Sequence, residues 1–290
     1  MKEIDYAAPA TLTEAAALLA QNGARALAGG TDVIVQIREN RRDYGLLVDL
    51  KNVPELNTLS FDAREGLILG AAVPCYRVAE HPDIRKLYPG LVDAVGLIGG
   101  VQIQSRASVG GNLCNASPAA DSIPALIALG ATAVSISPSG TRYTVPVEQF
   151  CTGPGRTLLG PGEVLVHLHV PRPAPNSGSA YLRFIPRNEM DIAVVGVGVA
   201  LTLNDKRTAC VSARIALGAV GPTPLLVPEA GAALAGSSPL ADADIDQAAV
   251  LAQAAAKPIS DMRGSADYRR HLVGVLVKRA LRIAIDRAKG

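Results

Sequence analysis

Cysteine is scarce in this sequence, and the four cysteines that are present are scattered. Cys75, Cys114, Cys151 and Cys210 form no C-x-x-C pair, so the chain by itself lacks the ligand spacing of an iron–sulfur cluster or a structural zinc site. Widely separated cysteines also give no disulfide framework. We therefore expect a cytoplasmic protein that binds no cluster of its own.

Charge of one sign and long apolar runs are also lacking. The net charge of +2 gives no reason to expect nucleic acid or an anionic membrane as a partner. No apolar run is long enough for a membrane span, and residues 1–5 lack the apolar core of a signal peptide. With 290 residues, of which 49% are hydrophobic, the chain can fold into two or three compact units.

The familiar signatures of nucleotide, metal and hydrolytic sites are missing as well. There is no G-x-x-x-x-G-K-[ST], and Gly196-Val197-Gly198 lies inside a strand-like run, where packing explains it. His167 and His169 would face the same side of a strand, but no third ligand is evident, so we assign no metal. No histidine stands beside a serine or cysteine motif, so we assign no catalytic residue.

Apolar patterns predict alternating strands and helices in the first part of the chain, and long strands followed by two helices in the last part. Thr11 and Glu14 resemble a capping box for a helix over 12–22. A β-α-β unit ending near Pro54 and a second set of strands and helices precede the clearest linker, 171–179. The remaining predicted elements are strands at 25–28, 46–50, 67–70, 132–137, 143–147, 163–170, 192–203 and 211–220, and helices at 32–39, 124–129, 240–256 and 266–288, with another starting near 73–76.

Two Gly-Gly turns stand out, Ala28-Gly29-Gly30-Thr31-Asp32 and Ser108-Val109-Gly110-Gly111-Asn112. Backbone without side chains can approach a ligand closely and direct successive N–H groups at one anion. Two such turns that converge would hold a pyrophosphate, which makes a dinucleotide the first ligand to consider. A single Gly-Gly turn of this kind is far more often a simple chain reversal than a binding loop. At Gly111 we expect a close approach to phosphate and a positive φ, whereas Gly153-Pro154-Gly155 and Gly160-Pro161-Gly162 resemble surface turns.

Together with the residues that flank them, these two turns resemble motifs of a known protein family. Residues 25–32 (RALAGGTD) and 106–121 (RASVGGNLCNASPAAD) are similar to the FAD-binding loops of the molybdenum hydroxylases. That family includes xanthine dehydrogenase, carbon monoxide dehydrogenase and bacterial N-heterocycle dehydrogenases, and the match is to their flavoprotein, or medium, subunit. Residues 261–270 (DMRGSADYRR) and 277–280 (VKRA) resemble the last domain of that subunit.

The resemblance implies an α+β (mixed α/β) fold. A two-part FAD-binding domain of the para-cresol methylhydroxylase type would span 1–175, with subdomains at about 1–55 and 56–175. A C-terminal α+β domain of the carbon monoxide dehydrogenase flavoprotein type would span 176–290. The scattered cysteines and the chain length argue against the benzoyl-CoA reductase branch, which inserts a cysteine-bearing loop.

The resemblance also implies which residues bind FAD. Thr31, Ser108 and the glycine backbones would meet the pyrophosphate, while Asn112 and Asn115 would bond phosphate or ribityl oxygens. Asp121 would accept from ribose, and Arg183 would lie near the flavin pyrimidine. Loop 187–192 would lie over the isoalloxazine with Ile192 at its face, although Ile192 is equally well explained as a strand-core residue. The whole set is Arg25, Ala26, Leu27, Ala28, Gly29, Gly30, Thr31, Asp32, Val33, Ala107, Ser108, Gly110, Gly111, Asn112, Cys114, Asn115, Asp121, Arg183 and Ile192.

By the same resemblance, the chain is an electron-transfer subunit with noncovalent FAD. The 2Fe–2S clusters and molybdopterin would lie only on a small iron–sulfur subunit and a large molybdopterin subunit, assembled as a dimer of heterotrimers. The electron acceptor would be NAD, oxygen, a quinone or a carrier protein. Two alternatives remain: a self-contained flavin oxidoreductase of the vanillyl-alcohol oxidase class, and a scaffold with degenerate loops. Covalent flavin would indicate the first, and absence of flavin the second.

Overall fold

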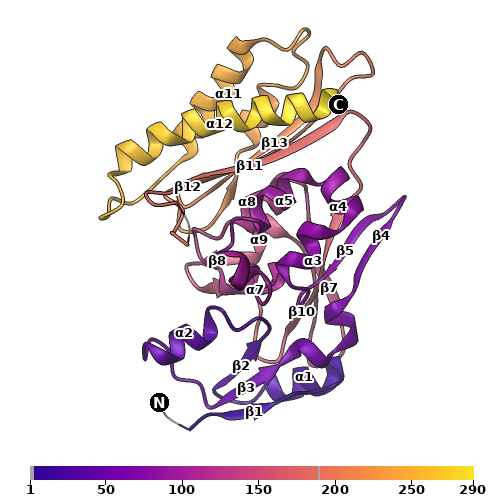
Figure 1. Cartoon of the computed structure of the whole chain (residues 1–290), viewed down its shortest axis with the longest axis vertical. Helices are drawn as coiled ribbons and strands as arrows, with labels where there is room; N and C mark the ends of the chain where they lie inside the picture. The colour runs from indigo at the N-terminus through magenta and orange to yellow at the C-terminus, as the bar shows by residue number, and fades with distance from the viewer. Residues whose placement is uncertain (1–2, 189) are drawn as a thin grey trace.

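Three sheets of three or more strands follow one another along the long axis of the molecule (Figure 1), and β8 and β9 form a further two-stranded sheet. The computed structural model describes residues 3–188 and 190–290. A three-stranded sheet at the N-terminal end and a five-stranded sheet in the middle belong to the first part of the chain, and a four-stranded sheet belongs to the last part. The fold is the mixed α/β arrangement that the sequence predicts.

The N-terminal sheet is parallel and has the strand order β1-β3-β2. It confirms the predicted β-α-β unit and adds an edge strand, β1, that the sequence did not indicate. Thr11 caps the first helix as expected, since its Oγ1 accepts from the Glu14 N–H at 3.2 Å. That helix ends three residues before the predicted position 22. The elements are β1 (Asp5–Ala7), α1 (Leu12–Leu19), β2 (Ala24–Leu27), α2 (Val33–Arg38) and β3 (Leu46–Asp49).

The middle sheet is antiparallel, with the order β4-β5-β10-β6-β7. Its buried strands and the helices around it form the largest core cluster, which includes Leu69, Leu126 and Leu168. The elements are η1 (Leu50–Asn52), η2 (Pro54–Asn57), β4 (Leu59–Asp62), β5 (Gly66–Gly70), α3 (Cys75–Glu80), α4 (Pro82–Leu87), α5 (Pro89–Val95), α6 (Val101–Gln104), α7 (Val109–Asn115), α8 (Ser122–Ala128), β6 (Thr132–Ile136), β7 (Arg142–Pro146), α9 (Val147–Phe150), β8 (Cys151–Gly153), β9 (Arg156–Thr157) and β10 (Val164–Pro171).

The last sheet, β11-β12-β13-β14, lies between two layers of helices (Figure 1). Helices α12 and α10 lie on its outer face, with α11 packed against both, and α5 and α8 of the preceding part cover the other face. The predicted packing role of Gly198 is confirmed, because a Cβ there would meet the backbone of Pro124 in α8. The elements are β11 (Ser177–Phe184), β12 (Val195–Leu203), β13 (Cys210–Gly218), β14 (Leu225–Leu226), α10 (Pro228–Ala232), α11 (Asp242–Ala255) and α12 (Ala266–Lys289).

The predicted linker 171–179 is wrong at both ends. Strand β10 continues to Pro171 and β11 begins at Ser177, so the connection is 172–176. The small residues that looked typical of a linker are instead needed for packing. A Cβ on Gly178 would overlap the Ala284 carbonyl oxygen of α12 and lie 2.7 Å from the Ala288 nitrogen. Helix α12 thus lies directly on the backbone of β11.

A charged contact fixes α12 to the first part of the chain. The Arg287 guanidinium donates to both carboxylate oxygens of Asp93 in α5, at 2.6 and 3.0 Å, and to the Ser179 carbonyl at 2.7 Å. Such a bidentate pair is directional as well as ionic. It joins residues 194 positions apart and so stabilises the docking of the C-terminal sheet.

We expect Arg287→Met to lower the free energy of unfolding by about 1.5–3 kcal/mol, the typical range for hydrogen bonds to charged groups. Denaturant unfolding of the purified protein measures this. The matched control is Arg270→Met on the same helix, since Arg270 is ion-paired, among the described residues, only with Asp267 at 2.8 Å on an exposed surface. The control substitution should lower the free energy of unfolding by less than about 1 kcal/mol. Equal losses for the two variants would contradict a docking role for Arg287.

Candidate functional site

The two Gly-Gly turns touch each other through their backbones. A Cβ on Gly29 would overlap the Arg106 carbonyl oxygen and lie 2.9 Å from the Ala107 Cα. Gly30 has a φ of +78°, in the left-handed region where glycine is favoured. Segments about eighty positions apart therefore converge, as predicted, and at Gly29 only glycine permits the contact.

The turns lie at a cavity of about 390 Å³. Most of the predicted binding residues line it together, namely Arg25, Ala26, Ala28, Gly29, Gly30, Thr31, Asp32, Val33, Ala107, Ser108, Gly110, Gly111, Asn112, Cys114 and Asn115. Four predicted residues are not among the lining residues: Leu27, Asp121, Arg183 and Ile192. Leu27 is buried in a small cluster with Ile37 and Leu47 instead.

The cavity has a further wall that the motifs did not reveal. Gly160-Pro161-Gly162, predicted to be a surface turn, lines it together with residues 163–165 at the start of β10. Apolar residues of η1, η2 and the turn that follows β5 also line the cavity, among them Leu50, Leu56, Ala71 and Ala72. Only tertiary folding places these segments beside the turns, so no local sequence signal could have indicated them.

The first turn offers free donors to an anion. No described residue accepts a hydrogen bond from the backbone N–H groups of Gly29, Gly30, Thr31 or Asp32. Four successive unpaired N–H groups at a cavity wall are an arrangement that binds phosphate. The unpaired N–H groups make this turn a candidate site for an anion.

The second turn is the first turn of a helix rather than a loop. Ser108 is the N-cap of α7, and its Oγ accepts from the Gly111 N–H at 3.0 Å. The prediction of a positive φ at Gly111 is wrong, since Gly111 lies within the helix and is not among the glycines with positive φ. The position that requires glycine is Gly110, where a Cβ would lie 2.5 Å from the Ala71 Cα.

A polar chain crosses from α2 to α7 at the cavity. Tyr44 Oη donates to Gln36 Oε1 at 3.2 Å, and Gln36 Nε2 donates to Asn115 Oδ1 at 3.2 Å. Next to it, Asn112 Oδ1 accepts from Ser122 Oγ at 2.7 Å. Each asparagine is thus held by its oxygen, which leaves its amide N–H groups to donate to a ligand.

Asp121 and Arg183 form a buried pair between the two parts of the chain. Asp121 Oδ2 accepts from Arg183 Nη1 at 2.7 Å, and its Oδ1 accepts from Tyr181 Oη at 2.8 Å. Burial raises the pKa of Asp121 to about 6, while Arg183 and Tyr181 act to lower it. Burial, together with the charge of Asp121, raises the pKa of Tyr181. Arg183 Nε is buried without a partner among the described residues.

This burial makes folding stability depend on pH. Because the pKa of Asp121 is higher in the folded than in the unfolded chain, folded protein holds the proton more tightly. The contribution of Asp121 to the free energy of unfolding is fully present below about pH 4 and is lost as the pH rises through 6. From pH 5 to pH 7, the unfolding free energy of the wild type should fall relative to that of Asp121→Asn by about 1 kcal/mol. Chemical denaturation at several pH values measures the difference, and a constant difference would contradict the raised pKa.

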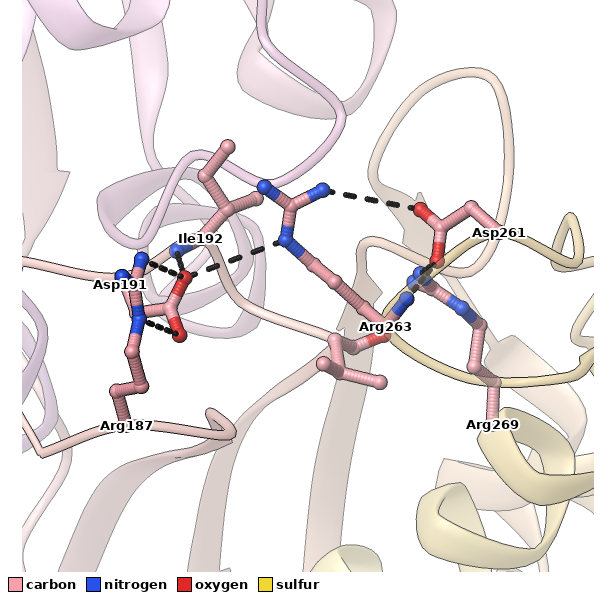
Figure 2. A network of polar contacts seen from close by, with 7 residues as sticks. Arg187, Asp191, Ile192, Asp261, Arg263 and Arg269 are labelled. Carbon is pink, nitrogen blue, oxygen red and sulfur yellow. Dashed lines mark hydrogen bonds and ion pairs between the residues drawn. The ribbon is translucent and has the colours of Figure 1, made fainter.

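Ile192 lies on an exposed loop, which excludes a strand-core role for it. Its side chain is 52% exposed, and β12 begins only at Val195. Figure 2 shows how the loop is held: Asp191 accepts from the Ile192 N–H at 2.8 Å and from the Arg187 guanidinium at 3.2 and 3.3 Å. Arg263 lies between Asp191 and Asp261, 4.0 and 3.9 Å from their oxygens. Glu189, in the same predicted loop, lies outside the described residues.

Within residues 3–188 and 190–290, no group of three or more His, Cys, Asp or Glu residues could hold a metal ion. His169, one of the strand pair, bonds through Nε2 to the Glu65 carbonyl oxygen at 2.8 Å. In the part of the chain described by the structure, no helix has the length and apolar character of a membrane span.

Comparison with known proteins agrees with this site. Residues 2–173 match the family described as "FAD binding domain in molybdopterin dehydrogenase". The chain belongs to that family. Residues 180–284 match the "CO dehydrogenase flavoprotein C-terminal domain", so the order of the two domains is also that of a molybdopterin dehydrogenase flavoprotein.

Individual members of the family are similar over nearly their whole length. The putative xanthine dehydrogenase FAD-binding subunit of Escherichia coli is 33% identical, covering 98% of this chain and 97% of the relative. The carbon monoxide dehydrogenase medium chain of Afipia carboxidovorans is 33% identical, with 98% of each chain covered. Solved structures of carbon monoxide dehydrogenase from Oligotropha carboxidovorans and quinoline 2-oxidoreductase from Pseudomonas putida 86 superpose with TM-scores of 0.93 and 0.91, each at 31% identity, covering 99% and 100% of both chains.

Proposed function

We propose that the cavity binds FAD noncovalently and that its pyrophosphate lies between the two glycine turns. The observation that carries this proposal is the backbone contact of Gly29 with Arg106 and Ala107 beside four unpaired N–H groups. Thr31 and the amide groups of Asn112 and Asn115 would add donors along the same wall. The apolar lining contributed by Leu50 and Leu56 suits the less polar parts of the cofactor.

The chain's proposed role is electron transfer in a molybdenum hydroxylase. FAD supplies the chemistry, because a flavin accepts electrons and delivers them to another molecule. The protein binds the cofactor and orients it toward partner subunits. Those partners are a small iron–sulfur subunit and a large molybdopterin subunit, assembled as a dimer of heterotrimers. The external acceptor is NAD, oxygen, a quinone or a carrier protein. The names of the relatives, a FAD-binding subunit and a medium chain, support only the coarser part of this proposal, that the chain is one FAD-binding subunit among several.

Several finer assignments stay predictions. They include the ribose contact of Asp121, the position of Arg183 near the flavin pyrimidine, and Ile192 at the flavin face. In the structure, both oxygens of Asp121 already accept from Tyr181 and Arg183, so a ribose hydroxyl would have to share one of them. The division of the chain at residue 175 and a cytoplasmic location are likewise predictions.

Replacement of Gly29 by alanine should weaken FAD binding about 10- to 100-fold. The new Cβ overlaps the Arg106 backbone, so the two turns must separate at a cost of about 1.4–2.8 kcal/mol. Titration of FAD fluorescence with the apoprotein measures the dissociation constant. The control is Gly45→Ala, where no heavy atom lies within 4 Å of the added Cβ, and its affinity should match the wild type. A folded Gly29→Ala protein with unchanged affinity would remove this contact from the site.

The proposed function is tested by comparing the isolated chain with the chain combined with its partner subunits. The isolated chain, loaded with FAD, should not oxidise N-heterocycles, aldehydes or carbon monoxide, because the described residues provide no cluster and no metal site. Turnover should require the iron–sulfur and molybdenum subunits, and the flavin absorbance should bleach only in their presence. Rapid anaerobic bleaching by such a substrate with this chain alone, freed of metals, would instead support the self-contained oxidase.

A further inference from the structure

Tyr6, Asp49 and Lys51 form a hydrogen-bonded chain that ends on the first glycine turn. Tyr6 Oη donates to Asp49 Oδ2 at 2.6 Å, and Lys51 Nζ donates to Asp49 Oδ1 at 2.6 Å. The same ammonium donates to the Ala28 carbonyl oxygen at 3.1 Å. Strands β1 and β3 and the short helix η1 are thus connected to the peptide that opens the turn, although none of the three side chains is among the residues that line the cavity.

The contact at Ala28 determines where the next N–H points. In a trans peptide the C=O and the following N–H lie in one plane and point in opposite directions. The Ala28–Gly29 peptide is trans, since the only cis bond among the described residues is Ser238–Pro239. A carbonyl held by Lys51 therefore directs the Gly29 N–H, which has no acceptor among the described residues, away from Lys51.

We propose that Lys51 is a positioning residue for the FAD site: it holds the Ala28 carbonyl and so orients the Gly29 N–H to receive the phosphate anion. This inference rests on the proposed function. Without Lys51 the peptide could rotate and present the Ala28 carbonyl oxygen to the phosphate, which repels it. We call this contact between Lys51 and the Ala28 carbonyl the clamp. Lys51 does not line the cavity, so the clamp makes no contact with the cofactor.

Charge and burial at the base of the chain fit such a clamp. Asp49 is 7% exposed; burial acts to raise its pKa, but hydrogen bonds from Lys51 and Tyr6 hold the pKa below its usual value. The Asp49 carboxylate therefore remains ionised at neutral pH and neutralises the ammonium, so Lys51 acts through hydrogen-bond geometry rather than as a free cation. Asn57 Nδ2 donates to the Lys51 carbonyl at 2.8 Å and fixes the backbone below it.

The test uses Lys51→Met, which keeps the length of the side chain and removes its donors. We expect the dissociation constant for FAD to rise about tenfold, which corresponds to about 1.4 kcal/mol. In the apoprotein, the backbone carbonyl resonance of Ala28 and the amide resonance of Gly29 should shift. Lys51→Arg, which keeps a cationic donor, should restore part of the affinity. The matched control is Lys278→Met, where a partly exposed lysine pairs with Asp246 at 2.7 Å in the C-terminal part; its FAD affinity should be that of the wild type.

The outcomes separate the clamp from the proposed function. Wild-type affinity together with unchanged Ala28 and Gly29 resonances in Lys51→Met would overturn the proposal. Equal loss of affinity in Lys51→Met and Lys278→Met would also overturn it, because the effect would then be general instability. Failure of the wild type itself to bind FAD would refute the proposed function, and unshifted apoprotein resonances in Lys51→Met would then refute the clamp on their own.

Discussion

The site depends on one contact, the approach of the Gly29 backbone to the backbone of Arg106 and Ala107. Two backbone segments can approach each other this closely only where no side chain lies between them. This contact joins the parallel N-terminal sheet to the helical segment around α7 and forms the cavity at their junction. Because both turns carry backbone N–H groups, we propose that bringing them together creates a site for an anion.

The same junction is supported from both sides. Behind the first turn, Lys51 holds the Ala28 carbonyl. Behind the second, Gly110 lies against the Ala71 backbone, and Ser108 caps the helix. Farther along the chain, the pair between Asp121 and Arg183 connects the start of α8 to β11 of the C-terminal sheet. The FAD-binding part and the C-terminal part are therefore fixed relative to each other by buried polar contacts as well as by apolar packing.

The sequence predicted the parts of this architecture that have a local signal. Apolar periodicity located α11, α12 and most strands, and the two Gly-Gly motifs located the cavity walls. It failed where partners are distant. The first three residues of β11 were predicted to belong to a linker, because the small residue Gly178 packs against α12, more than a hundred positions away. Tyr181 and Arg183 are about sixty positions from Asp121, and Lys51 has no pattern that separates it from any surface lysine.

The central claim is that both glycine turns contact the same bound cofactor, and amide resonances of the apoprotein test it most directly. Addition of FAD to isotope-labelled protein should shift the N–H signals of Gly29, Gly30 and Gly110 together, at one FAD per chain. The signal of Gly236, which lies between α10 and α11 in the C-terminal part and has nothing within 4 Å of an added Cβ, should stay in place. Saturable FAD binding that leaves either turn unshifted would contradict the account.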